Sequence, residues 1–165
     1  MTQILLAALL VLNQILDAGN SITAFSLLLY ALTFNLRARV ARTFALVLGC
    51  LTVVYFGDVL SSLAHGSADL EMWLRVQWLG ISFLPTAIFH LSDALLASTG
   101  RPSRGKRAVA IRLGYAASLG TLVLAGQTDL VAGTLARAGT AGYLRPGPLF
   151  LLFLLFFVVS LAAAG

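Results

Sequence analysis

Long apolar stretches separated by short polar or basic segments dominate the pattern along this chain. A helix needs about 20 mostly apolar residues to cross the hydrocarbon core of a bilayer. Five stretches approach or exceed that length, at about residues 4–36, 43–64, 70–98, 108–125 and 149–165. We therefore predict an all-α integral membrane bundle of about five transmembrane helices, forming one domain over residues 1–165.

The first stretch is longer than one crossing requires. Its 33 residues would form a helix of about 50 Å, so we expect the crossing at about 14–36, with the first turns at or beyond the outer surface. A split near residues 17–20 is the alternative. Asn13, Asp17 and Asn20 share one helical face. Asp17 needs a partner such as Arg75 if it lies in lipid, or is hydrated outside it, and the sequence leaves both open.

The segment between the fourth and fifth stretches, residues 126–148, is rich in Gly, Ala and Thr. It also holds Arg137, Arg145, Pro146 and Pro148, which do not suit a membrane span. We predict an outer loop here, with a short surface helix over residues 130–138.

Two local features concern how the helices pack. Pro85 lies in the middle of the third stretch and should kink it, because proline removes one backbone hydrogen bond. Small residues four apart, Ala45 with Gly49 and Ala116 with Gly120, favour close contact between helices.

Composition supports the membrane assignment. Hydrophobic residues make up 59% of the chain and charged residues only 10%, with a mean hydropathy of +0.95. A soluble domain usually carries about 25% charged residues. The outer surface must therefore face lipid, and the bilayer is the first expected partner.

The positive charges favour one orientation. The proposed inner segments hold eight basic residues, namely Arg37, Arg39, Arg42, Arg101, Arg104, Lys106, Arg107 and Arg112. The outer side holds Arg75, Arg137 and Arg145. This bias predicts an outer N-terminus and a cytoplasmic C-terminus. It explains the net charge of +5 without nucleic acid as a partner. Trp73 and Trp78 suit the outer aromatic belt.

The N-terminus agrees with this orientation. Met1, Thr2 and Gln3 lack the basic residues that open a signal peptide. Cleavage is therefore not expected, and the missing positive charge favours the outer side for this end.

A polar stripe on the third helix contains the best candidate ligand-binding residues, Trp78, Ser82, Thr86, His90 and Asp93. Their spacing places them along one helical face. Polar groups at membrane depth usually face the bundle interior or a wet cavity. The stripe predicts a ligand pocket or a proton-sensing His90–Asp93 pair. The alternative is a structural seam between helices, and haem or chlorophyll ligation by His90 is a third interpretation.

The second helix carries Tyr55, Asp58, Ser62 and His65 at similar spacing. Asp58 should lie at about the depth of Arg75 on the next helix, and an unpaired charge there is costly. We predict a structural ion pair between Asp58 and Arg75, with ligand recognition by Asp58 as the alternative.

Catalytic signatures are absent from the sequence. No glycine-rich phosphate loop precedes a lysine, and no Cys or His pair has metal-ligand spacing. The only cysteine, Cys50, lies in an apolar run and is expected to be a small core residue. We expect no enzymatic activity and no metal site, and the sequence indicates no particular cofactor.

Several segments resemble a known family. Four segments carry the resemblance: residues 73–85 (WLRVQWLGISFLP), the following Thr99-Gly100-Arg101, residues 37–45 (RARVARTFA) and residues 147–150 (GPLF). They are similar to the N-terminal seven-helix sensor region of bacterial histidine kinases and related signalling proteins. The resemblance spans nearly the whole chain. It implies a membrane sensor that passes a signal to a cytoplasmic output domain of a two-component system.

Relative to that family, two helices and the output domain are missing, so the chain alone cannot phosphorylate a substrate. The last helix ends at Gly165 without a basic anchor. This predicts either further native sequence or a partner that holds the end.

The expected location is the bacterial inner membrane, with multiple crossings. Other membrane helices or subunits, and a small lipophilic ligand, are the expected further partners. The competing hypothesis is a small accessory subunit of a respiratory or photosynthetic complex that stabilises helices or binds a lipophilic cofactor.

Overall fold

The computed structural model describes residues 2–34, 37–100, 105–138 and 141–165. Helices dominate this part of the chain. The elements are, in chain order, α1 (Thr2–Phe34), α2 (Arg39–Leu63), α3 (Ser67–Ser98), α4 (Gly105–Gln127), β1 (Ala132–Ala138), β2 (Ala141–Pro146) and α5 (Phe150–Ala164).

The five predicted helices are confirmed, each within a few residues of its expected bounds. Four of them, α1 to α4, are long and apolar enough to cross a membrane. The fifth, α5, is apolar but has only 15 residues, which corresponds to about 22 Å of helix.

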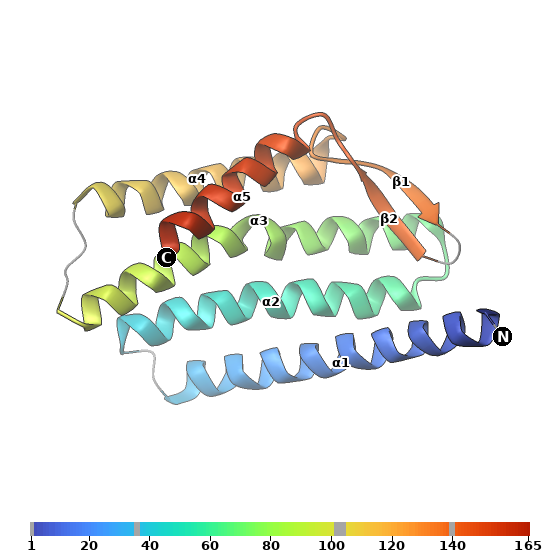
Figure 1. The fold of residues 1–165 in the computed structure, drawn as a ribbon, viewed down its shortest axis with the longest axis horizontal. Helices are drawn as coiled ribbons and strands as arrows, with labels where there is room; N and C mark the ends of the chain where they lie inside the picture. Colours follow the sequence, from blue (N-terminus) through green and yellow to red (C-terminus); the bar gives the residue numbers. More distant parts are fainter. Residues whose placement is uncertain (1, 35–36, 101–104, 139–140) are drawn as a thin grey trace.

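Consecutive helices run antiparallel in a row from α1 to α4, while α5 lies against α3 on the side of α4 (Figure 1). This arrangement gives the molecule two ends. One end contains the start of α1, the α2–α3 turn and the β-hairpin, and is called the hairpin end below. The other contains the end of α1, the start of α2, the end of α3, the start of α4 and the end of α5. It is called the basic end, because Arg37, Arg39, Lys106 and Arg107 belong to it.

Helix α3 is the centre of the bundle, since it packs against α2, α4, α5 and both strands. It approaches α2 closely at Gly80, where an added Cβ would lie 2.4 Å from the backbone oxygen of Cys50. Cys50 itself is buried, as expected. Pro85 is also buried, and α3 continues through it.

The small-residue pairs chosen from the sequence do not mark the close approaches. An added Cβ at Gly49 or Gly120 would meet nothing within 4 Å, so the close contact predicted at these two glycines is wrong. Between α2 and α3 the tight glycines are instead Gly57, against the side chain of Gln77, and Gly80. A four-residue spacing identifies one helical face, but it does not say which face meets a neighbour.

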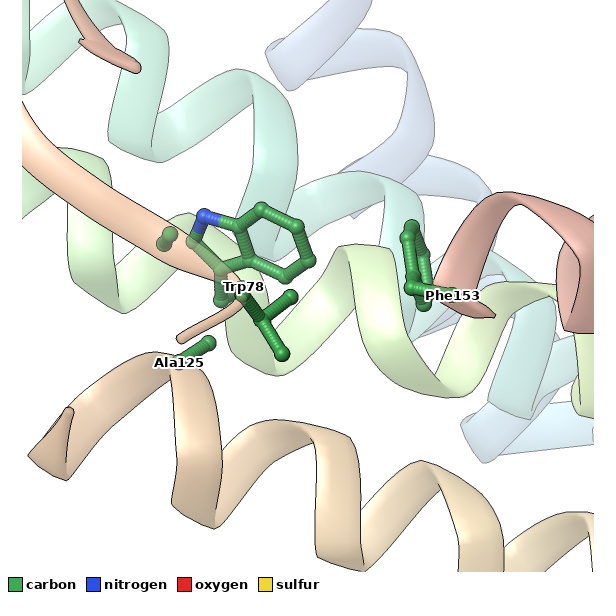
Figure 2. Close-up of a cluster of buried hydrophobic side chains, with 5 residues drawn as sticks. Trp78, Ala125 and Phe153 are labelled. Atoms are coloured by element: carbon green, nitrogen blue, oxygen red, sulfur yellow. The ribbon is translucent and has the colours of Figure 1, made fainter. Parts of the chain in front are cut away.

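An apolar cluster joins α3, α4, β1 and α5 near the hairpin end (Figure 2). The rings of Trp78 and Phe153 meet edge to face at a centroid distance of 5.2 Å, and Ala125 of α4 is fully buried beside them. Trp78 is only 8% exposed. The aromatic-belt interpretation is therefore wrong for Trp78, because a belt residue must reach the bilayer surface.

Residues 130–138 do not form the surface helix expected there. They contain the whole of β1, which pairs antiparallel with β2 in register Leu135 to Leu144 and Arg137 to Gly142. The base of the hairpin is tight, since the Leu149 amide donates to the Leu130 carbonyl at 2.8 Å. A Cβ at Gly147 would lie 2.3 Å from that same oxygen. The "all-α" prediction is corrected accordingly to a mostly helical fold with one hairpin.

Helix α1 packs mainly on α2. Its buried contacts are small side chains, Ser21, Ala24 and Ala31. It has eight more residues than α2, and its first turns project beyond the neighbouring helices at the hairpin end (Figure 1). The segment is continuous, so the alternative of a split near residues 17–20 is not observed.

We expect Gly80→Ala to destabilise the fold by about 2 kcal/mol, because the new methyl group would overlap a helix backbone that cannot move aside cheaply. Thermal unfolding in detergent measures the effect. Gly49→Ala is the matched control, since open space surrounds that position. Equal stability of the two variants would contradict the close α2–α3 approach.

Candidate functional site

The polar stripe predicted on α3 faces α4. Thr86 Oγ1 and Ser118 Oγ share a buried hydrogen bond of 3.0 Å. His90 Nδ1 and the Tyr115 hydroxyl are also 3.0 Å apart. Ser82 is fully buried, and its hydroxyl has no hydrogen-bond partner within the described ranges. We call Ser82, Thr86 and His90, with Ser118 and Tyr115, the polar seam.

A glycine on α4 allows the seam to close. An added Cβ at Gly114 would lie 3.0 Å from the Thr86 side chain. The helices therefore approach closely enough for short polar side chains to meet directly. This arrangement has the features of the structural seam that was the alternative to a ligand pocket. The ligand-binding roles expected of Trp78, Ser82, Thr86, His90 and Asp93 stay predictions.

Asp93 lies at the basic end and is completely buried. Arg39 Nη2, from the first turn of α2, donates to Asp93 Oδ2 at 2.7 Å. Arg107 Nε, from the first turn of α4, lies 3.4 Å from Oδ1. Two guanidinium groups thus flank one carboxylate, and we call these three residues the charge junction. A buried carboxylate without such partners would be very costly.

The charge junction also holds the end of α5. Arg107 Nη2 donates to Ser92 Oγ at 3.0 Å and to the Ala163 carbonyl at 3.2 Å. Ser92 Oγ in turn donates to the Ala164 carbonyl. The last carbonyls of a helix lack internal donors and carry partial negative charge. The cationic side chain of Arg107 therefore stabilises the end of α5 by its charge as well as by its hydrogen bond.

His90 and Asp93 take different partners. His90 bonds Tyr115 of α4, whereas Asp93 pairs with Arg39 and Arg107. The sequence pointed to the pair because both lie on one face of α3. It missed the arginines, which the positive-inside pattern explained as membrane anchors. Their positions, at the starts of the two helices that flank Asp93, were the available signal.

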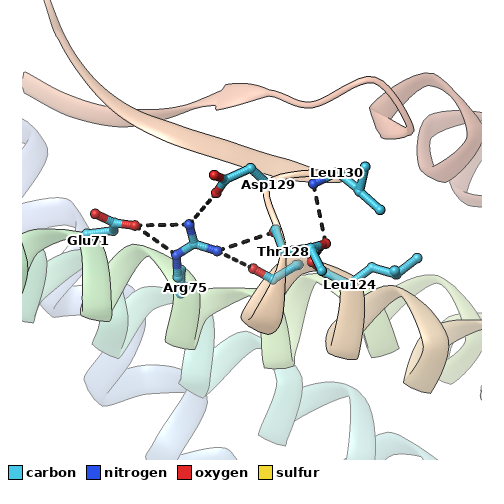
Figure 3. Close-up of polar contacts among 7 residues, drawn as sticks. Glu71, Arg75, Leu124, Thr128, Asp129 and Leu130 are labelled. Atoms are coloured by element: carbon cyan, nitrogen blue, oxygen red, sulfur yellow. Dashed lines mark hydrogen bonds and ion pairs between the residues drawn. The ribbon is translucent and has the colours of Figure 1, made fainter.

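At the hairpin end, Arg75 of α3 binds several groups (Figure 3). Its guanidinium pairs with Glu71 at 2.9 Å and with Asp129 at 2.7 Å. It also donates to the Ala125 carbonyl at 2.8 Å, and more weakly to Thr128. One side chain therefore fixes the end of α4 and the start of the hairpin segment to α3.

The Asp58–Arg75 ion pair expected from the sequence is not formed. Asp58 Oδ1 instead accepts a hydrogen bond of 2.8 Å from Gln77 Nε2. Residues two apart on a helix point in nearly opposite directions, so Gln77 faces α2 while Arg75 faces α4. The spacing of Glu71 and Arg75, four residues apart, was the sequence signal for the pair that does form.

Within the described residues, no group of three or more His, Cys, Asp or Glu side chains is placed to hold a metal ion. Comparison with known proteins found no matching family model, no similar curated protein and no similar solved structure.

We expect Asp93→Asn to cost about 3 kcal/mol of folding free energy, because it leaves two arginines without their buried counter-charge. The side chain of Arg39 is 48% exposed and can be hydrated. The loss is therefore expected at the lower end of the range of about 3–5 kcal/mol for a broken buried ion pair. Chemical unfolding in detergent measures it.

Asp69→Asn is the matched control, since Asp69 is exposed in the first turn of the same helix. A loss of the same size in both variants would contradict the role of burial at Asp93.

Proposed function

We propose that this chain is the membrane-embedded sensor region of a bacterial signal-transduction protein, without catalysis of its own. The observation that carries the proposal is the charge junction. Through it, the buried carboxylate of α3 connects α2, α4 and, by way of Arg107, the last turn of α5. A small displacement of α3 therefore alters contacts of three other helices at one end of the bundle.

The distribution of charge supports insertion with the basic end in the cytoplasm. Six of the nine basic residues that the structure describes belong to the basic end, together with Asp93 alone among the six acidic residues. The other acidic residues, Asp17, Asp58, Asp69, Glu71 and Asp129, belong to the hairpin end. Such a bias favours retention of the basic end on the inner side. The inner membrane of a bacterium is the proposed location.

Helix α3 is suited to carry a signal between the two ends. At the hairpin end its Arg75 and Gln77 hold Asp129 and Asp58. Midway, Pro85 leaves one carbonyl of the preceding turn without its usual donor, which lowers the cost of bending there. The seam hydrogen bonds join single hydroxyl and imidazole groups that can exchange partners. These features favour two arrangements whose populations a ligand can shift.

One observation favours a second candidate, the accessory subunit of a larger membrane complex. An apolar cleft of about 530 Å³ lies between α4 and α5, lined in part by Gly120, Leu124, Leu152 and Phe156. It could take a lipophilic cofactor or a further helix. Purification from membranes with a stoichiometric pigment or subunit would favour this candidate over the sensor.

The orientation has a direct test in a Cys50→Ser background. We expect Tyr143→Cys, on the exposed hairpin, to react with a membrane-impermeant maleimide in cells whose outer membrane has been opened. Lys106→Cys, at the exposed start of α4, should react only after the inner membrane is permeabilised. The reverse pattern would contradict the proposed orientation.

The sensor proposal predicts more than one position of α5. Spin labels at Leu46→Cys and Val159→Cys, both exposed sites, report the α2–α5 distance in nanodiscs by pulsed electron spin resonance. We expect two distance populations whose ratio changes in Asp93→Asn. That variant removes the ion pairs of Asp93 with Arg39 of α2 and with Arg107, which contacts the end of α5.

Asp69→Asn serves as the control and should leave the ratio unchanged. Arg39→Lys, which keeps the charge but loses the guanidinium geometry, provides a milder change if Asp93→Asn fails to fold. One distance population, identical in the wild type and in both junction variants, would refute transmission through the charge junction.

A further inference from the structure

A cavity of about 550 Å³ opens at the hairpin end between α1, α2 and the hairpin. Eight of its twelve lining residues are polar or charged, whereas the cleft between α4 and α5 is almost entirely apolar. Its volume lies in the range of sites that enclose small molecules, about 300–1,000 Å³. Neither the polar seam nor the charge junction contributes to its lining.

Two carboxylates stand in the helical wall of this cavity, Asp17 from α1 and Asp58 from α2. Each is held by one amide. Asn13 Nδ2 donates to Asp17 Oδ2, and Gln77 Nε2 donates to Asp58 Oδ1, both at 2.8 Å. The second oxygen of each carboxylate accepts no hydrogen bond from the part of the chain that the structure describes. Each wall carboxylate is thus oriented but retains an acceptor for a ligand.

The hairpin wall carries the opposite charge. Arg137 of β1 lines the cavity and makes no ion pair with any described residue. Its register partner Gly142 packs tightly on the start of α3, since an added Cβ there would lie 2.4 Å from the Leu70 side chain. The strand position that presents Arg137 is therefore fixed against the bundle.

We propose that this cavity binds a basic amino acid, a molecule with two cationic groups and one carboxylate. The protein offers the complementary set of two carboxylates and one guanidinium. The ammonium groups pair with Asp17 and Asp58, and the ligand carboxylate pairs with Arg137 in a charge-assisted contact. Polar side chains such as Ser61 and His65 line the remaining space and suit a ligand that is hydrophilic throughout.

This inference deepens the proposed function by naming the ligand that the sensor would detect. It rests on the proposed function only for the side of the membrane from which that ligand reaches the cavity. Binding to the purified chain does not depend on orientation or on signalling. If the basic amino acid does not bind, the α2–α5 distances can still show two populations. If those distances show one population, the cavity can still bind the amino acid. The two ideas therefore fail separately.

Isothermal titration calorimetry on the full chain in nanodiscs tests the proposal with three probes. Lysine carries all three groups, norleucine lacks the side-chain ammonium, and cadaverine lacks the carboxylate. We expect lysine to bind, and each analogue to bind at least about tenfold more weakly, the value of one charge-assisted contact. No heat with lysine at millimolar concentration, or equal affinity for lysine and norleucine, would overturn the proposal.

Variants assign the three contacts. Asp17→Asn and Asp58→Asn should each weaken lysine binding by about tenfold or more. Arg137→Gln should weaken lysine binding similarly but leave cadaverine unchanged, because cadaverine has no carboxylate to lose. Arg145→Gln is the matched control, since this hairpin arginine does not line the cavity. Lysine affinity that is unchanged in all three cavity variants would refute the assignment.

Discussion

A carboxylate removed from water inside an apolar bundle must be neutralised by neighbours, and the arrangement of this molecule at its basic end follows from that constraint. Asp93 is fully buried, and the first turns of α2 and α4 each supply an arginine to it. The starts of those two helices are thereby fixed relative to α3. Because Arg107 also reaches the carbonyl of Ala163, the compensation of one charge extends to the end of α5.

The hairpin end has the reverse arrangement, in which one cation is shared by two carboxylates and by backbone carbonyls. Arg75 neutralises Glu71 and Asp129 and also satisfies carbonyls at the end of α4. The two ends of α3 thus carry opposite charges with opposite partners, and α3 cannot slide along its axis without breaking one set. Between them the seam relies on neutral hydrogen bonds, each worth about 1 kcal/mol. The centre of the interface is therefore easier to rearrange than its ends.

The sequence predicted the helices because each is a long apolar stretch bounded by polar or basic residues, and four of the five are long enough to cross a bilayer. It predicted the polar face of α3 from the helical spacing of its polar residues. It did not identify the partners of that face, because a partner depends on the rotation of neighbouring helices. Arg75 accordingly pairs with Asp129 rather than with Asp58. The hairpin was missed because Gly- and Thr-rich loop residues give little strand signal until their pairing partner is known.

Helix α1 stands at the edge of the row and is held mainly by α2, yet it contributes Asp17 to the polar cavity. The cavity is therefore complete only while α1 remains docked. By thermodynamic reciprocity, any molecule that binds more tightly to the complete cavity strengthens the attachment of α1 by the same factor. The helix at the edge of the row would then be the one whose hydrogen exchange slows most when the cavity is filled.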